Sequence, residues 1–247
     1  MPKIFLSPST QEYNLYVTGT GSEEYYMNLL ADAMEPYLRA NGIGFTRNDP
    51  NTSAAASVRL ANQGYYDLYL ALHSNASGVG SEGKNRGIIA FYYPTSGNGK
   101  RAAEIFAADL RDIYPLPDQV TTRSTTILIE VRGPRAPAVL LELGYHDNYA
   151  DAMWVENNLN AIAANLVLSL TRYFDLPFLY PQQPFEAKVS TPNGGAINLR
   201  SAPWTASSVV AVLPNGTPLT VYSSYQGWYA VTSGVNAGFV NAAFVST

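Results

Sequence analysis

The sequence predicts an α/β fold with a mainly parallel sheet flanked by helices on both faces, followed by a small all-β barrel. Up to about residue 175, short apolar runs alternate with amphipathic stretches, which is typical of βαβ units. Several of these runs are apolar throughout, as expected for strands buried on both faces. Beyond residue 186 the chain changes to short β-like runs separated by turns that contain Gly and Pro.

The α/β domain is expected to span residues 1–175. Its first helix is predicted to begin after Ser22 and to end before Gly42, because Ser is a favoured N-cap and Gly a favoured C-cap residue. Further helices are predicted over 54–63, 100–113 and 151–173. The predicted strands cover 4–6, 43–46, 68–72, 88–93 and 138–143.

A proline-rich stretch separates this domain from the tail. Residues 176–186 contain three prolines and few charges, which favours a semi-rigid linker. The tail, residues 187–247, is predicted to form the barrel. Its strands are expected over 196–200, 209–213, 218–222, 227–232 and 237–240.

Composition excludes several classes of partner and site. A net charge of -4 with no cluster of Lys and Arg argues against nucleic acid. The absence of Cys excludes disulfides and thiolate zinc sites. No stretch is apolar enough to predict a membrane span, and the first residues lack the apolar core of a signal peptide. We therefore expect neither a nucleic-acid nor a membrane partner.

The chain has two histidines, and both follow predicted strands. His73 comes directly after the apolar run 69–72. Glu142 comes directly after the apolar run 138–141, and His146 follows four residues later. Functional side chains in open α/β sheets gather at the carboxyl ends of strands. We therefore expect His73, Glu142 and His146 to lie at one edge of the sheet.

Short motifs along the first domain occur in a characteristic order. They are Ser22-Glu23, Arg47, RLAN at 59–62, ALHSNA at 71–76, Gly87-Ile88 followed by 91–93, and APAVLLELGY at 136–145. In this order and spacing, residues 3–174 resemble the zinc-dependent N-acetylmuramoyl-L-alanine amidases. In the tail, INLRSAP at 197–203, LPNGT at 213–217, GWYAV at 227–231 and GFV at 238–240 resemble bacterial SH3-like domains that bind cell walls.

Aromatic residues of the tail divide into two groups. Trp228 and Phe239 are predicted to lie in the barrel core. Trp204, Tyr222 and Tyr225 are the candidates for contact with the wall, because aromatic side chains that stay exposed often mark binding surfaces.

The resemblance to the amidases implies a zinc site and a general base. Family members hold zinc with a His after the first strand, a Glu at the start of the first helix and a His in the His-Ser-Asn-Ala segment, and a Glu near the end of a later strand polarises the water. Carried over, His73 is a zinc ligand and Glu142 the general base. At about 100° per residue, Glu23 lies in the apolar stripe of the first helix and Glu24 at its edge. A carboxylate facing a core needs a partner such as a metal, which favours Glu23 as the second ligand.

The first zinc-binding His of the family is absent from this chain. The family has Asp-Pro-Gly-His-Gly where this chain has Ser-Pro-Ser-Thr-Gln at residues 7–11. His146 offers the nitrogen donor that zinc prefers, so we predict it as the third ligand, with Gln11 and Asn75 near the substrate. In the alternatives, Gln11 from the first loop takes that position, or His146 is a hydrogen-bonded loop residue and the site has lost its metal.

Two functions follow from these expectations. The first is zinc-dependent hydrolysis of the amide bond between N-acetylmuramic acid and L-alanine in peptidoglycan, by a monomer that acts outside the cytoplasm and that its tail tethers to the wall. Its partners are then the glycan and the stem peptide, and a phage or a non-classical route could release it. The second is a non-catalytic wall-binding or regulatory protein on an amidase scaffold. Glu23 and Glu142 beside His73 favour the enzyme.

Overall fold

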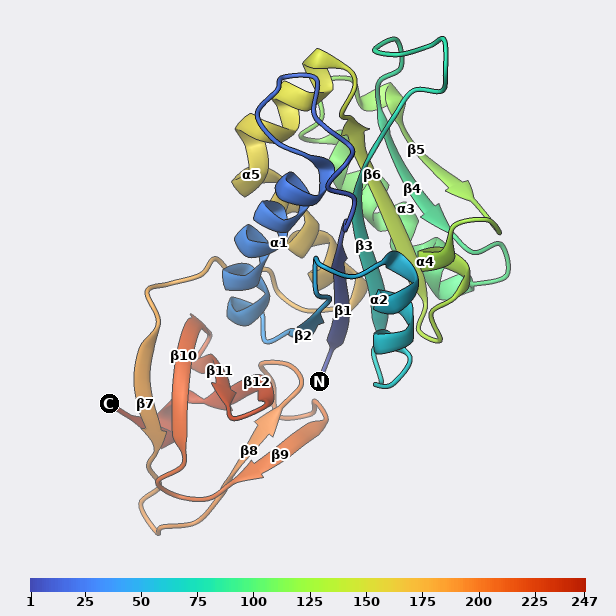
Figure 1. Ribbon diagram of the computed structural model, residues 1–247. Coiled ribbons are helices and arrows are strands. Elements are labelled where there is room, and N and C mark those ends of the chain that lie inside the picture. The colour runs from blue at the N-terminus through green and yellow to red at the C-terminus, as the bar shows by residue number, and fades with distance from the viewer. The chain divides into compact units, whose positions relative to one another are not determined.

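The computed structural model describes residues 1–247 (Figure 1). The chain divides into two compact units. One comprises Ile4–Met34 and Thr46–Tyr173, and the other comprises Met1–Lys3, Glu35–Phe45 and Phe174–Thr247. No helix in either unit has the length and apolar character that crossing a membrane requires.

A six-stranded sheet forms the centre of the α/β fold, in the order β2-β1-β3-β6-β4-β5. β1 pairs in parallel with β3, β3 with β6 and β4 with β5, whereas β4 runs antiparallel to β6. The predicted mainly parallel sheet is therefore confirmed, and β5 was not predicted. The strands are β1 (Lys3–Pro8), β2 (Gly44–Arg47), β3 (Leu68–Asn75), β4 (Ile88–Tyr92), β5 (Val120–Ser124) and β6 (Ala138–Tyr145).

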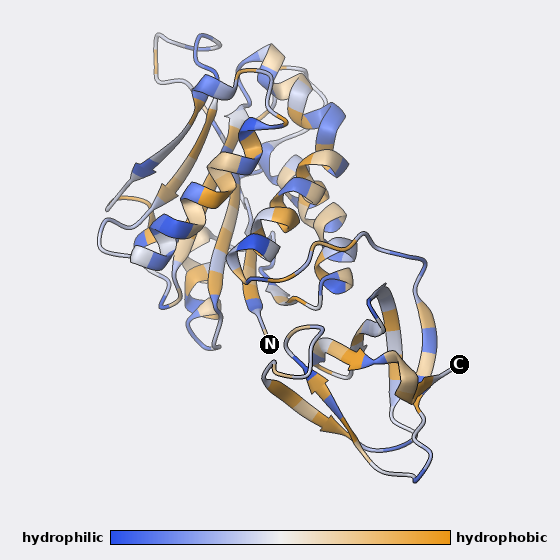
Figure 2. Cartoon of the chain, turned by 180° about the vertical axis from the view of Figure 1, so that it is seen from behind, coloured by the Kyte–Doolittle hydropathy of each residue, from blue (hydrophilic) through white to orange (hydrophobic).

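Helices cover both faces of this sheet (Figure 1). On one face, α2 and α4 pack on Phe5, Tyr69 and Leu140. On the other, α3 and α5 pack against each other and against β6. Figure 2 shows hydrophobic residues along the central strands, as expected for strands covered on both sides. The helices are α1 (Glu23–Ala40), α2 (Ala54–Ala61), α3 (Gly97–Arg111), α4 (Ile129–Arg132) and α5 (Tyr149–Tyr173).

The tail forms a seven-stranded sheet in the order β13-β7-β10-β11-β12-β8-β9. All five predicted strands are present, and β7 and β13 add to them. Trp228 and Phe239 are buried, as predicted, at 9% and 0% exposure. The strands are β7 (Phe185–Val189), β8 (Ile197–Arg200), β9 (Val209–Leu213), β10 (Pro218–Tyr225), β11 (Trp228–Ser233), β12 (Asn236–Asn241) and β13 (Val245–Ser246).

The turn after α1 belongs to the same compact unit as the tail. The Asn41 amide donates to the Leu179 carbonyl at 2.9 Å and accepts the Leu179 N–H at 2.7 Å. Gly42 has a φ of +63°, and a Cβ at this position would meet the Phe239 ring at 2.6 Å, so only glycine suits both the turn and the packing. The predicted domain boundaries at 175 and 186 stay a prediction.

Candidate active site

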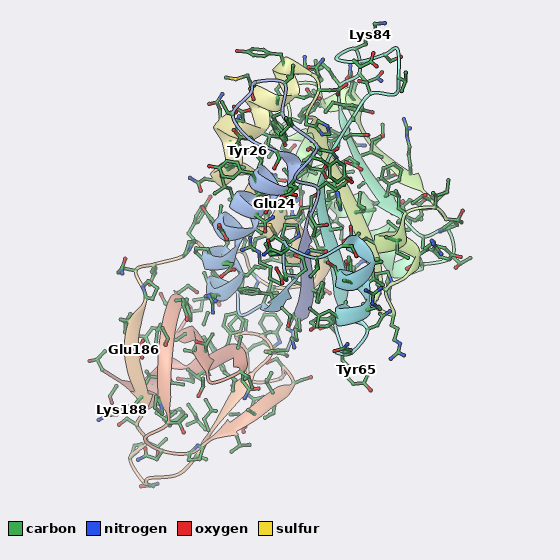
Figure 3. All side chains as sticks on the ribbon, in the orientation of Figure 1. Glu24, Tyr26, Tyr65, Lys84, Glu186 and Lys188 are labelled. Atoms are coloured by element: carbon green, nitrogen blue, oxygen red, sulfur yellow. The ribbon has the colours of Figure 1, made fainter.

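The start of α1 directs Glu23 into the protein. Ser22 Oγ accepts the backbone N–H of Tyr25 at 3.1 Å, which is the predicted N-cap interaction. Glu23 is 1% exposed, whereas the carboxylate of Glu24 accepts a hydrogen bond from Asn28 one turn along the helix (Glu24 is labelled in Figure 3). The prediction that Glu23, and not Glu24, faces the interior is therefore confirmed.

His73 and Glu142 are register partners on the neighbouring strands β3 and β6. Side chains alternate between the faces of a strand, so both point to the face on which Tyr69 and Leu140 lie. This is the face that α2 and α4 cover. The predicted proximity of His73 and Glu142 therefore follows directly from the register of two parallel strands.

His73 lies between two carboxylates. Its Nδ1 is 2.7 Å from Glu23 Oε1, and its Nε2 is 2.8 Å from Glu130 Oε2. Burial alone lowers the pKa of His73, but the hydrogen bonds and charges of Glu130 and Glu23 outweigh it and raise the pKa well above its usual value. In the metal-free protein His73 is therefore an imidazolium that donates a hydrogen bond to each carboxylate.

Glu130 is a residue of this site that sequence reasoning missed. It lies on the four-residue helix α4 and is 3% exposed. Its Oε1 accepts hydrogen bonds from Ser7 Oγ at 2.6 Å and from the Tyr69 hydroxyl at 2.7 Å. Burial raises the pKa of Glu130, but hydrogen bonds from His73, Ser7 and Tyr69 outweigh it and hold the pKa below its usual value. A helix this short has no apolar periodicity, and the one available signal was a lone acidic residue within the apolar stretch 127–131.

Glu142 differs from the other two carboxylates in having an oxygen without a partner. Its Oε2 is buried and accepts no hydrogen bond. Burial raises the pKa of Glu142 to about 7; the charge of His73 opposes this shift, and the charges of Glu23 and Glu130 reinforce it. A carboxyl group with a free oxygen and a pKa near neutrality is suited to take up and return a proton.

A cleft of about 480 Å³ opens onto these groups. Its walls come from the loop after β1, from the start of α2, from α4 and from the ends of β3 and β6. His73, Glu142 and the newly found Glu130 thus lie in the wall of a cleft that a substrate can enter. The lining includes Gln11, Tyr13, Ser53, His73, Glu130 and Glu142.

Comparison with known families assigns both parts of the chain. Residues 12–172 match the N-acetylmuramoyl-L-alanine amidase family, and residues 194–246 match the bacterial SH3 domain. The chain belongs to the N-acetylmuramoyl-L-alanine amidase family. No curated protein matches this amidase.

Three solved amidase structures have a similar fold. AmiC2 of Nostoc punctiforme is 14% identical with a TM-score of 0.61, and the match covers 70% of this chain and 97% of that one. The catalytic domain of CwlV from Bacillus (Paenibacillus) polymyxa is 19% identical with a TM-score of 0.61, covering 71% and 99%. CwlD from Clostridioides difficile, solved with the GerS lipoprotein, is 13% identical with a TM-score of 0.59, covering 71% and 99%. At these identities the likeness supports the fold.

Gln11 lies beside the two predicted ligands of the amidase. Its Nε2 is 3.3 Å from both Glu23 Oε1 and His73 Nδ1. Its Oε1 accepts hydrogen bonds from the Tyr13 hydroxyl at 3.1 Å and from Asn14 at 3.3 Å, which hold the amide in place. The loop that lacks the family's first His therefore places an amide next to Glu23 and His73.

His146 and Asn75 lie in the adjoining loops. His146 Nδ1 is 3.0 Å from the Ser74 carbonyl, and its ring stacks on Tyr16 with centroids 5.9 Å apart. No hydrogen bond joins it to Glu23 or His73, so the structure does not bring His146 to the two other predicted ligands. The Asn75 side chain accepts the N–H of Ala76 and so holds its own loop. The zinc role of His146 and the substrate role of Asn75 stay predictions.

The chemistry of the donor set fits a zinc ion at Glu23 and His73. A carboxylate oxygen and an imidazole nitrogen are both established zinc donors, and here they face each other. The Gln11 amide faces the same two atoms and offers an oxygen after rotation of its terminal group, at the cost of the hydrogen bonds from Tyr13 and Asn14. No three His, Cys, Asp or Glu side chains are arranged so that together they could hold a metal ion. The set therefore has two strong donors and one weak donor, and we expect zinc to be held less tightly than by three strong ligands.

The raised pKa of Glu142 predicts a pH-dependent cost to stability in the metal-free amidase. Between the ordinary value of 4.5 and about 7, the folded protein holds a proton on Glu142 that the unfolded chain has lost, so stability falls as pH rises through this window. Glu142→Gln removes the titration. We expect the variant and the wild type to be equally stable at pH 4, and the variant to be more stable by up to about 3 kcal/mol at pH 8. Urea unfolding at both pH values measures this difference, and equal stability at pH 8 would contradict the burial argument.

Proposed function

We propose that this chain hydrolyses the amide bond between N-acetylmuramic acid and L-alanine in peptidoglycan, with zinc as its cofactor. Membership of the amidase family supports the reaction class. The observation that carries the proposal is Glu142, whose carboxyl group has a free buried oxygen and a pKa of about 7 at the edge of an open cleft. This is the property that a general base for amide hydrolysis needs.

The residues of the site have different roles in this reaction. Glu23 and His73, with Gln11 beside them, would hold a zinc ion, which supplies a Lewis acid that lowers the pKa of water. Glu142 as carboxylate accepts a proton from the attacking water and later donates it to the nitrogen of the leaving L-alanine. A C–O bond forms at the lactyl carbonyl and the C–N bond breaks. The products are a free lactyl carboxylate and a free alanine amine.

The chemical identity of the products tests the reaction. Purified peptidoglycan incubated with the zinc-supplemented protein should release peptides that begin with a free L-alanine amine, without new reducing sugar ends. Labelling of free amines followed by mass spectrometry detects the first product, and a reducing-sugar assay detects the second. New reducing ends without alanine amines would mean that the chain cleaves the glycan, and the proposal would be wrong.

A non-catalytic wall-binding protein is the second candidate. The observation in its favour is the loop at residues 7–11, which supplies the amide of Gln11 where the family has an imidazole. Wild-type protein that takes up no zinc, releases no alanine amines and still binds walls would support this candidate over the enzyme.

We further propose that the tail binds the cell wall and that the protein acts outside the cytoplasm, as a monomer tethered to its substrate. The match to the bacterial SH3 domain supports this role. The unit that contains the tail also has a cavity of about 420 Å³ with aromatic and polar walls, among them Asn198, Arg200, Trp228, Asn241 and Phe244. Of the three aromatic candidates, Trp204 is 42% exposed. The Tyr222 hydroxyl lies 3.2 Å from Thr232 Oγ1, and Tyr225 packs on the core around Trp228.

Trp204→Ala in the full chain is expected to weaken binding to purified walls by at least about tenfold, because exposed Trp residues are frequent energetic anchors of binding surfaces. The measurement is the fraction of protein that sediments with walls across a range of wall concentrations. Tyr65→Ala is the matched control, because Tyr65 is an exposed aromatic residue outside the tail (Figure 3). Equal binding by both variants and the wild type would remove Trp204 from the binding surface.

A further inference from the structure

Glu130 contacts the one nitrogen of His73 that the proposed metal position does not use. His73 Nδ1 faces Glu23 and Gln11, while Nε2 faces Glu130 Oε2 at 2.8 Å. Glu130 and His73 are 3% and 6% exposed, so water does not compete for this contact. The carboxylate of Glu130 and the imidazole therefore determine each other's hydrogen bonding.

This contact determines which nitrogen of the His73 ring keeps its proton when the other nitrogen binds a metal. A carboxylate only accepts hydrogen bonds, so Nε2 must carry a proton to satisfy Glu130. A nitrogen that binds a metal must be free of its proton, and the only other ring nitrogen is Nδ1. We propose that Glu130 is a positioning residue that keeps the proton on Nε2 and so presents Nδ1, with Glu23, to the metal. This inference rests on the metal role given to His73 under the proposed function.

Glu130 is itself held rigidly. Ser7 Oγ from β1 and the Tyr69 hydroxyl from β3 both donate to Oε1, and the two hydroxyl oxygens lie 3.0 Å apart. Ser7 and Tyr69 are fully buried. Two strands and α4 thus fix one oxygen of the carboxylate and leave the other for His73. A group fixed in this way can set the orientation of the ring it contacts.

The same hydrogen bonds make Glu130→Gln an informative variant. Ser7 and Tyr69 are donors, so a glutamine would keep its oxygen toward them and turn its NH2 group toward His73 Nε2. Nε2 then accepts a hydrogen bond and carries no proton, so the ring keeps only the proton on Nδ1, which faces Glu23. The variant therefore preserves the shape of the side chain and removes the Nε2 proton.

Two measurements test the proposal. In long-range ¹H–¹⁵N NMR spectra, the chain's two histidines give two ring systems, and His146 serves as the internal reference. Wild type should show a proton on His73 Nε2, and Glu130→Gln should lose it. Zinc affinity, measured by competition with a chelator, should fall 10- to 100-fold in Glu130→Gln, the range typical for loss of a group that orients a metal-binding His. Glu130→Asp, which keeps an acceptor-only carboxylate, should retain the Nε2 proton.

Ser169→Ala is the control for a merely structural role. It removes a buried hydrogen bond, from Ser169 Oγ to Asp109, that lies outside the network of Glu130, so it should keep the Nε2 proton and near-wild-type zinc affinity. A Glu130→Gln protein that keeps the Nε2 proton, or a Ser169→Ala protein that loses as much zinc affinity, would overturn the proposal. If the wild type binds no zinc, the NMR result decides the role of Glu130 alone, and the failure belongs to the proposed cofactor.

Discussion

Glu142→Gln is expected to lower kcat for the release of alanine-terminated peptides by roughly 10²- to 10⁴-fold, because an amide cannot take the proton from the attacking water. The free oxygen and the raised pKa of Glu142 are the physical basis. Zinc content should stay at the wild-type level, since Glu142 is not among the proposed ligands. The measurement is the steady-state rate on soluble muropeptides, with zinc per chain determined on the same samples.

Glu24→Gln provides the matched control for Glu142→Gln. It makes the same chemical change on a carboxylate near the start of α1 that hydrogen-bonds to Asn28 and not to His73. We expect its rate to stay within about twofold of the wild type, as for other substitutions away from the reacting groups. A folded, zinc-loaded Glu142→Gln protein with the rate of Glu24→Gln would refute the role of Glu142 as general base.

Removal of the imidazole of His73 is expected to have the largest effect on the metal. His73→Ala leaves Glu23 with only the amide of Gln11, so zinc affinity should fall by more than the roughly 10- to 100-fold that loss of an orienting group costs. Gln11→Ala should lose less zinc than His73→Ala, because an amide oxygen is a weak zinc donor. His146→Ala should retain the most, because His146 does not join Glu23 and His73 in a group of side chains that could hold a metal. Zinc per chain after dialysis against a weak chelator ranks the three variants.

The same ranking decides the third ligand. A loss of zinc in His146→Ala equal to that in His73→Ala would assign the third position to His146, whose Nε2 is not used by the contact with Ser74. A metal-free wild type would instead favour the non-catalytic scaffold.

The sequence alone predicted where a side chain points wherever its spacing within one helix or strand determines which face it occupies. The helix period placed Glu23 on the buried side of α1 and Glu24 at its edge, and the structure agrees. The apolar runs before His73 and Glu142 predicted two strands with their carboxyl ends together, and the parallel pairing of β3 and β6 makes these two residues neighbours. Periodic burial within a strand or helix is a local property, so it can be predicted from the order of neighbouring residues.

Tertiary structure decided which loops and short segments meet at the site. Glu130 lies 57 residues from its partner His73, on a helix too short to show a period. From the sequence, His146 and Gln11 were alternative candidates for the third metal ligand. In the structure His146 contacts Ser74, whereas Gln11 contacts Glu23 and His73. Side chains of loops take their positions from hydrogen bonds to distant parts of the chain, and such partners leave no periodic pattern in the sequence. The two strands that carry His73 and Glu142 could therefore be predicted from residue order, whereas the groups that surround His73 could be identified only in the folded chain.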